Sequence, residues 1–415
     1  MLYPRKITKE VKKWLFEKEI IILNGPRQVG KTTLLEILKS ELAKAGVSEK
    51  TIFYLNLEEL KILETLNQDP ENILKYVINP KEKNYFFLDE IQYLDNPSNF
   101  LKHLYDKYAG RIKIIATGSS SLELKAKLQD SLAGRKVSFL VNPLTFEEFL
   151  NFKNFPDISY FKKEEIPEDI KSEFDKELDE YLIYGGMPAV VLQRDKKLKR
   201  KMLEEYVSAY VNKDIRVIGK IESIARFNAL VKILSSQIGN LLNISELSNA
   251  AKISRRNTEK YLDLLEYTFV LDKISPFKKN VRKQVIKMPK IYFFDMGVRN
   301  AILGNFLELE SRQDGGRLFE NFVFLELKNQ RKNKIFFYRS VNKAEIDFVI
   351  EEEAKIILIE SKYKKLVRPI DSRVLENFLE KEKNVKKAVV VNLNLNRKDN
   401  SVEYIDYRRI RMECL

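Results

Sequence analysis

Short apolar runs dominate the pattern in the first third of the chain. Two continuous apolar runs lie at 20–23 and 85–88, a third at 112–116 is interrupted by Lys113, and each is followed by polar residues. Continuous apolar runs of this length are typical of strands buried on both faces of a parallel sheet. The first run leads into a stretch with Leu34, Leu35 and Leu38 at helical spacing. The pattern predicts an α/β domain with a parallel sheet over residues 1–150.

The middle of the chain has helical spacing. Apolar residues recur at intervals of three or four residues between 195 and 240. Two short helices follow within 243–274, with Ser245 and Ser254 as expected caps, and then a pair of strands. Helix, turn, helix and β pair is the winged helix-turn-helix pattern. We therefore expect a helical domain over 151–218 and a winged helix over 219–289.

Helices and strands alternate again after residue 290. An amphipathic helix at 314–330 precedes three strands, a second helix and a last strand. The strands lie at 334–340, 344–353, 355–361 and 386–393, and the second helix lies at 371–381. This α-β-β-β-α-β order is that of the PD-(D/E)xK nuclease fold. Residues 290–415 are thus predicted to form an α/β restriction-endonuclease-like domain.

The first apolar run leads directly into a P-loop pattern. The motif G-x-x-x-x-G-K-T lies between the predicted strand and helix, which is the required context. Backbone N–H groups and the helix N-terminus cradle phosphates in such loops, while the lysine reaches the β- and γ-phosphates and the threonine hydroxyl binds Mg²⁺. The residues expected to bind ATP are Gly25, Pro26, Arg27, Gln28, Val29, Gly30, Lys31, Thr32 and Thr33.

The next two apolar runs end in residues that complement the P-loop. Asp89 is expected to hold the Mg²⁺ hydration shell, and Glu90 to polarise the attacking water. Ser119 is the candidate sensor of the γ-phosphate, because ligands bind at the carboxyl edge of α/β sheets. The alternative is that residues 117–121 only turn the chain and cap the next helix.

Four polar residues give the last domain a candidate metal site. Glu320 lies on the predicted helix, Asp347 on the middle strand, and Glu360 and Lys362 at the end of an apolar strand. The three carboxylates could bind Mg²⁺ and the lysine could orient water for phosphodiester cleavage. A salt bridge from Lys362 to Glu360 or Asp347 would satisfy the same residues without chemistry.

Positive charge gathers around the winged helix. The net charge is +14, and residues 251–300 hold twelve Lys/Arg against five Asp/Glu, a net of +7. Such an excess favours a polyanionic partner, or it is a solvated face. The expected DNA contacts are Arg255, Arg256 and Asn257 at the start of the second helix and Lys278, Lys279, Arg282 and Lys283 in the wing.

Composition excludes several classes of site. With one histidine and one cysteine in 415 residues, neither an internal disulfide nor a Cys/His zinc site can form. No run approaches 18 apolar residues and the start lacks a secretory signal, so we expect a cytoplasmic protein without a membrane span.

The motifs together resemble one family. The runs "GPRQVGKTTLL", "LDEIQ", "TGSSS", "LAGR" and "LVNPLTFEEFL" are similar to the archaeal and bacterial AAA+-type ATPases of the STAND-like group. The resemblance implies a helical lid over 151–218. It also implies that Arg135 meets the phosphates, in cis or from a neighbouring subunit, and that Pro188 lies against the adenine. A salt bridge at Arg135 and a rigid turn at Gly185 to Pro188 are the alternatives.

The resulting hypothesis is a Mg²⁺-dependent ATPase that couples ATP to nucleic-acid binding or processing. Its expected cofactors are ATP and Mg²⁺, and its expected partner is DNA. The alternative is a STAND-like regulatory switch, in which an inactive nuclease-like domain recruits a protein partner and the winged helix is an internal regulatory domain.

Overall fold

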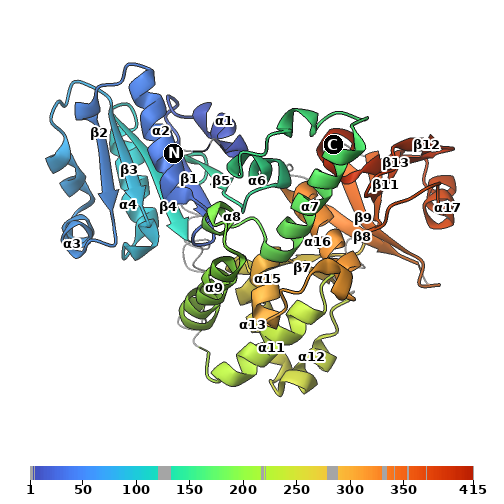
Figure 1. Cartoon of the computed structure of the whole chain (residues 1–415). Coiled ribbons are helices and arrows are strands. Elements are labelled where there is room, and N and C mark those ends of the chain that lie inside the picture. Colours follow the sequence, from blue (N-terminus) through green and yellow to red (C-terminus); the bar gives the residue numbers. More distant parts are fainter. Residues whose placement is uncertain are drawn as a thin grey trace. The chain divides into compact units, whose positions relative to one another are not determined.

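The computed structural model describes most of the chain. The described residues are 3, 5–119, 132–215, 219, 221–277, 288–329, 334–340, 342–352, 355–370 and 372–414. They form two compact units (Figure 1), one of Met1–Asn142 with Tyr267–Phe269 and one of Pro143–Glu266 with Val270–Leu415. In the described ranges, no helix has the length and apolar character needed to cross a membrane.

The first unit is built on a five-stranded parallel sheet with the order β2-β3-β4-β1-β5. This confirms the predicted parallel α/β domain. Two strands, β2 and β5, were not predicted, and in β5 the apolar residues are separated by Ser138. The elements are α1 (Lys6–Lys12), β1 (Ile20–Gly25), α2 (Lys31–Lys44), η1 (Glu49–Thr51), β2 (Ile52–Asn56), α3 (Leu60–Gln68), η2 (Pro70–Tyr76), β3 (Asn84–Asp89), η3 (Ile91–Tyr93), α4 (Pro97–Tyr108), β4 (Ile112–Ser119) and β5 (Lys136–Leu140).

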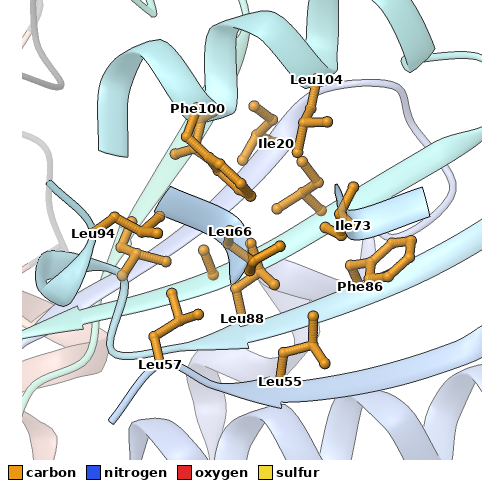
Figure 2. Close-up of a cluster of buried hydrophobic side chains, with 14 of the residues drawn as sticks. Ile20, Leu55, Leu57, Leu66, Ile73, Phe86, Leu88, Leu94, Phe100 and Leu104 are labelled. Atoms are coloured by element: carbon orange, nitrogen blue, oxygen red, sulfur yellow. The ribbon is translucent and has the colours of Figure 1, made fainter. Parts of the chain in front are cut away.

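Apolar side chains fill the space between one face of this sheet and the helices α3, η2 and α4. Figure 2 shows Leu66, Phe100 and Leu104 gathered over Ile20 and Leu88. Complete burial of such side chains contributes roughly 1.5–3 kcal/mol each. Helix α2 contacts β1 and β4 with its own buried leucines. This packing fixes the loop between β1 and α2 at the carboxyl edge of the sheet.

The second unit begins with helices and a two-stranded sheet. These elements are α6 (Phe146–Phe152), η4 (Ile158–Tyr160), α7 (Glu168–Tyr184), α8 (Pro188–Leu192), α9 (Lys196–Tyr206), the π-helix η5 (Val207–Asp214), α11 (Ile224–Ser236), α12 (Ile244–Ala251), α13 (Arg255–Tyr267), β6 (Leu271–Ile274), β7 (Lys290–Phe293), α15 (Met296–Leu303) and η6 (Leu309–Ser311).

The helix-turn-helix and its strand pair are present as α12, α13 and the antiparallel strands β6 and β7. The cap of α12 differs from the expectation. Asn243 accepts hydrogen bonds from the backbone N–H groups of Ser245 and Glu246. The cap therefore lies two residues earlier than expected, and asparagine caps a helix as well as serine does. Ser254 caps α13 as expected, accepting from the N–H of Asn257 at 3.2 Å.

A six-stranded mixed sheet ends the second unit, with the order β12-β13-β11-β10-β9-β8. Strands β8, β9 and β10 pair antiparallel, and β10, β11 and β13 pair parallel. The predicted α-β-β-β-α-β order is observed, and β12 and β13 were not predicted. The elements are α16 (Gly315–Lys328), β8 (Ile335–Arg339), β9 (Glu345–Glu352), β10 (Lys355–Ser361), α17 (Arg373–Lys381), β11 (Val385–Asn392), β12 (Arg397–Asp399), β13 (Val402–Asp406), η7 (Tyr407–Arg409) and α18 (Ile410–Glu413).

Strand β7 connects the helical part of this unit to the mixed sheet. It pairs with β6, and the backbone of its last residue, Phe293, exchanges two hydrogen bonds with the Asn321 side chain of α16. A boundary at residue 290, as expected from the sequence, would separate β7 from the strand with which it pairs.

Candidate functional site

The P-loop lies between the carboxyl end of β1 and the start of α2. Gly30 precedes the helix with φ of 90°, and Gln28 has φ of 62°. A Cβ atom on Gly25 would lie 2.3 Å from the carbonyl oxygen of Val141. Only glycine therefore allows the end of β1 to approach the backbone of Val141 so closely. The first turn of α2 directs backbone N–H groups into this loop, as phosphate binding requires.

The ammonium group of Lys31 is held inside the loop. Its Nζ atom donates to the carbonyl oxygens of Gly25 (3.1 Å) and Pro26 (2.8 Å), and the residue is buried. Burial lowers the pKa of Lys31, against the opposing effect of Glu90 and Asp89. A phosphate on the loop would replace the two carbonyl oxygens as partners of the ammonium and would relieve this desolvation.

The carboxylate of Asp89, at the end of β3, is surrounded by hydroxyl donors. Its Oδ2 atom accepts from Thr32 Oγ1 at 2.8 Å and from the Tyr54 hydroxyl at 2.7 Å, and Thr117 donates to the other oxygen. Burial and the bond to Asp89 raise the pKa of Tyr54. A hydroxyl and a carboxylate side by side form the oxygen-ligand set that Mg²⁺ takes together with nucleotide phosphates. These residues fit the implied metal ion.

Glu90 follows in a left-handed backbone conformation, with φ of 61°. A residue with a side chain adopts this conformation at a cost of roughly 1–3 kcal/mol, and such residues concentrate at active sites. Its backbone N–H donates to Thr117 Oγ1 at 2.9 Å, and Gln92 donates to its carboxylate. The hydroxyl of Thr117 therefore positions both acids. Ser119 pairs in register with Gly25, at the same edge of the sheet, but its side chain lies outside the described residues.

Arg135 lies at the opposite edge of the sheet from the P-loop. It immediately precedes β5, and its carbonyl oxygen accepts from the N–H of Ile20, the first residue of β1. The six-residue strand β1 separates this edge from the loop by about 17 Å, at roughly 3.3 Å per residue. The guanidinium instead pairs with Asp106, at 2.6 Å. Arg135 therefore forms the salt bridge that was the alternative to a contact with phosphates bound by the same chain. A contact of Arg135 with the phosphates of a neighbouring subunit stays a prediction.

The turn that contains Pro188 is fixed by a buried carboxylate in the second unit. Asp295 accepts from the N–H groups of Gly186 (2.7 Å) and Val298 (2.9 Å), and burial raises its pKa to about 6. A Cβ atom on Gly185 would lie 2.2 Å from Asp295 Oδ1. Pro188 then occupies the first position of α8. The rigid-turn alternative accounts for this motif, and the contact of Pro188 with adenine stays a prediction.

The four residues of the predicted metal site lie close enough for their charges to interact. Asp347 Oδ2 accepts from the Ser361 N–H (2.8 Å) and hydroxyl (2.7 Å), and Lys362 pairs with Glu360 at 2.6 Å. Burial and the nearby charge of Asp347 raise the pKa of Glu320 to about 7, and the same two causes raise that of Glu360 to about 7. The structure brings the four residues together, and the Glu360–Lys362 salt bridge is formed.

Three further residues of this cluster were not predicted. Lys290 Nζ lies 3.1 Å from Glu320 Oε1 and 2.6 Å from Glu345 Oε1, and the Tyr292 hydroxyl donates to Glu320 at 2.5 Å. Burial lowers the pKa of Lys290, but the negative charges of Glu320, Asp347 and Glu345 together raise it by more, so its pKa is higher than usual. Lysine at the start of an apolar run was the available signal. Among the described residues, no three Asp, Glu, His or Cys side chains form a group ready to hold a metal ion.

The predicted DNA contacts on α13 lie at its first turn. Arg255 and Arg256 are exposed, and Asn257 is half-buried. The Arg255 guanidinium pairs with Glu259 one turn later, at 3.1 Å. The predicted wing contacts Lys278, Lys279, Arg282 and Lys283 lie outside the described residues.

Residues 17–150 match the family model of the AAA domain. The chain carries an AAA domain. The P-loop, Asp89 and the five-stranded parallel sheet all lie within this match, so the protein is an AAA-domain ATPase. The AAA domain implies that ATP is bound at the P-loop.

Two further family models follow the AAA domain. A domain of unknown function, DUF8612, matches residues 175–309, and another, DUF4143, matches residues 315–410. The break between them falls after β7 and α15. Strand β7 is thus grouped with the helical part of the chain that contains its partner β6.

The chain is similar to proteins of other organisms over most of its length. An uncharacterized protein of Methanocaldococcus jannaschii is 29% identical over 85% of this chain and 76% of its own length. An uncharacterized protein of Haemophilus influenzae is 28% identical, with 89% and 88% covered. The structure of a Walker-type ATPase of Pyrococcus abyssi aligns with 73% of this chain and 96% of its own, at 16% identity and a TM-score of 0.48.

Proposed function

We propose that this protein is a Mg²⁺-dependent ATPase that couples ATP hydrolysis to the binding of nucleic acid. The observation that carries the ATPase part is the pairing of Thr32 with Asp89 at 2.8 Å, directly beside the P-loop lysine. Two conserved requirements of phosphoryl transfer, a phosphate cradle and an oxygen site for the metal ion, thereby meet at one edge of the sheet.

Each residue has a defined task in this proposal. The backbone N–H groups of the loop and the ammonium of Lys31 bind the phosphates and offset the charge that develops during transfer. Thr32 and Asp89 hold Mg²⁺, which supplies further positive charge at the phosphates. Glu90 accepts a proton from the attacking water, or orients it, and Thr117 keeps Glu90 and Asp89 in register.

A lysine substitution tests the ATPase part. Lys31→Ala is expected to lower kcat for ATP hydrolysis at least about 100-fold, because the developing phosphoryl charge loses its ammonium partner. Lys39→Ala is the matched control, since Lys39 lies on the same helix and is exposed. Turnover that survives Lys31→Ala and remains equal to that of the control would overturn the assignment.

The nucleic-acid part of the proposal is supported by α13. Its exposed first turn carries Arg255 and Arg256, within a segment of net charge +7. Arginine and lysine side chains that neutralise phosphates make DNA affinity fall linearly with salt on a logarithmic scale. Duplex DNA binding at low salt that weakens as salt is added is therefore expected of the full chain.

A double substitution on α13 tests this part. Arg255→Ala with Arg256→Ala is expected to raise the Kd for duplex DNA at least about tenfold and to reduce the salt slope by about 2. Arg200→Ala with Lys201→Ala removes two neighbouring charges from α9, each in an i,i+4 ion pair like Arg255, and serves as control. Equal affinities of the two variants, or no DNA binding by the parent protein, would contradict the proposal.

A second candidate function is a regulatory switch whose C-terminal domain recruits a protein partner. It is favoured by the pairing of every predicted metal ligand in the cluster: Glu320 with Lys290 and Tyr292, Asp347 with Ser361, and Glu360 with Lys362. Cleavage by Asp347, Glu360 and Lys362 stays a prediction. If the parent protein cleaves DNA with Mg²⁺ and Asp347→Ala/Lys362→Ala does not, with ATPase activity intact, the switch is wrong.

A further inference from the structure

Lys290 is the most deeply buried cation of the C-terminal acidic cluster. Its side chain is 1% exposed, while its ammonium lies between carboxylates from α16 and β9. The Nζ–oxygen distances are 3.1 Å to Glu320 and 2.6 Å to Glu345. A buried ammonium is stable only when it is paired in this way, so its place in the cluster is part of the fold.

The backbone of Lys290 is fixed on both sides. It pairs with Ile274 of β6, and it bridges to Leu241 in the loop after α11. The neighbouring bonds from Gly239 N–H to Ile291 O (2.9 Å) and from Leu242 N–H to Pro289 O (2.8 Å) extend this attachment. The side chain therefore enters the cluster from a strand that is held along its whole length.

The carboxylate of Glu320 has little room for another ligand. It accepts hydrogen bonds from Lys290 and from the Tyr292 hydroxyl, and its oxygens pack against Gly239. A Cβ atom on Gly239 would lie 2.9 Å from Glu320 Oε2, and Gly239 has φ of 72°. Glycine at this position thus allows the loop to cover the side of the carboxylate that the donors leave open.

We propose that Lys290 is the resident cation of this cluster, which excludes a divalent metal ion from Glu320, Asp347 and Glu360. A sheet of this topology with three acids and a lysine is expected to bind Mg²⁺, but these residues do not fit the ion as they are arranged. A divalent ion among the acids would be repelled by the ammonium of Lys290 and would have to displace the donors on Glu320 and Asp347.

Manganese binding to the nucleotide-free full-length protein tests this inference, because bound Mn²⁺ is counted by the loss of the free-ion signal in electron paramagnetic resonance. The parent protein and Glu320→Gln are expected to bind the same amount of Mn²⁺, since Glu320 ligates none. A lower amount in Glu320→Gln would overturn the inference. This comparison needs no change at Lys290.

The lysine itself is tested by Lys290→Met, which keeps an unbranched side chain one atom shorter and removes its charge. The acidic cluster of this variant is expected to bind one Mn²⁺ with an affinity at least tenfold higher than that of the same cluster in the parent protein. Lys290→Met/Glu320→Gln is expected to lose this increase in affinity. Lys364→Met removes one exposed positive charge from the same domain and should change nothing. A folded Lys290→Met protein without the gain would overturn the inference.

Mn²⁺ binding at the acidic cluster is tested independently of ATP hydrolysis at the P-loop. Each variant is expected to keep the ATP turnover of the parent protein, because none of the substituted residues belongs to the P-loop unit. Loss of turnover after Lys31→Ala and a change in Mn²⁺ binding after Lys290→Met therefore report on separate sites.

Discussion

The P-loop site and the C-terminal cluster solve the same physical problem in different ways. Each holds a carboxylate that burial would otherwise destabilise. Around Asp89 the donors are neutral hydroxyl groups, from Thr32, Tyr54 and Thr117. Around Glu320 one donor is the ammonium of Lys290. Hydroxyl groups orient a carboxylate and leave its negative charge in place, whereas an ammonium cancels it.

This difference decides what each site can attract. An acid with its charge intact is prepared for a cation that arrives with the nucleotide phosphates. An acid that is already neutralised has no such capacity. Residue types and their spacing along the chain do not distinguish the two cases. In the C-terminal cluster the deciding partner of Glu320 is Lys290, which lies 30 residues earlier in the chain.

The largest expected effect separates the two sites by their acids. Asp89→Asn should lower kcat for ATP hydrolysis at least about 100-fold, because the metal ion loses a charged ligand. Asp347→Asn should leave ATP turnover within about twofold of the parent value. Steady-state turnover at saturating Mg²⁺ measures both. Equal losses in the two variants would remove the contrast between the sites.

An intermediate effect concerns pH and the C-terminal cluster alone. The pKa of Glu320 is about 7 in the folded protein and close to 4.5 when exposed. The folded state therefore binds more protons between these values, so stability falls as pH rises from about 4.5 to 7. A shift of this size corresponds to about 3 kcal/mol. The Tm of the parent protein should decrease over this range.

Glu320→Gln sharpens that experiment, because glutamine does not titrate. The decrease in Tm between pH 5 and 8 should be smaller in this variant. The remaining decrease comes from other buried acids with raised pKa values, among them Glu360 (pKa about 7) and Asp295 (pKa about 6). Parallel Tm profiles for the parent protein and Glu320→Gln would show that Glu320 does not titrate there.

The smallest effect concerns the orientation of Asp89. Tyr54→Phe removes one hydroxyl donor, while Thr32 and Thr117 remain. One hydrogen bond to a charged group contributes about 1.5–3 kcal/mol, and part of it is recovered by water because Tyr54 is 41% exposed. We expect about a threefold higher Mg²⁺ concentration for half-maximal turnover. Tyr93→Phe, at the similarly exposed Tyr93, should leave the Mg²⁺ requirement unchanged.

Sequence patterns predicted most of what depends on local chemistry. The P-loop, Asp89 and the apolar strands β1, β3 and β4 are contiguous signals, and each is found where it was expected. Strand β2 was missed although residues 52–55 form a short apolar run, because no chemical motif follows it as one follows β1 and β3. The missed residue Tyr54 lies on that strand, and nothing in the sequence connects it to Asp89.

The remaining misses share one cause, which is that the partner lies far along the chain. The resemblance implied that Arg135 meets the phosphates in cis or from a neighbouring subunit, but the parallel register places it at the amino edge of the sheet, away from the P-loop of its own chain. Lys290 was assigned to no site, although its ion pairs with Glu320 and Glu345 place it in the acidic cluster. Long-range ion pairs form only in the folded sheet, and a lysine at the start of an apolar run does not indicate which distant acids will be its partners.

Asp295 gives the fold a property that can be used to find relatives. Its carboxylate binds the N–H of Gly186, 109 residues earlier, and leaves no space for a side chain on Gly185. Gly297 is equally constrained, since a Cβ atom there would lie 2.0 Å from the carbonyl oxygen of Tyr184. The paired strings "YGG" and "DMG" therefore form a two-part signature, and chains that have lost one part should have lost the other.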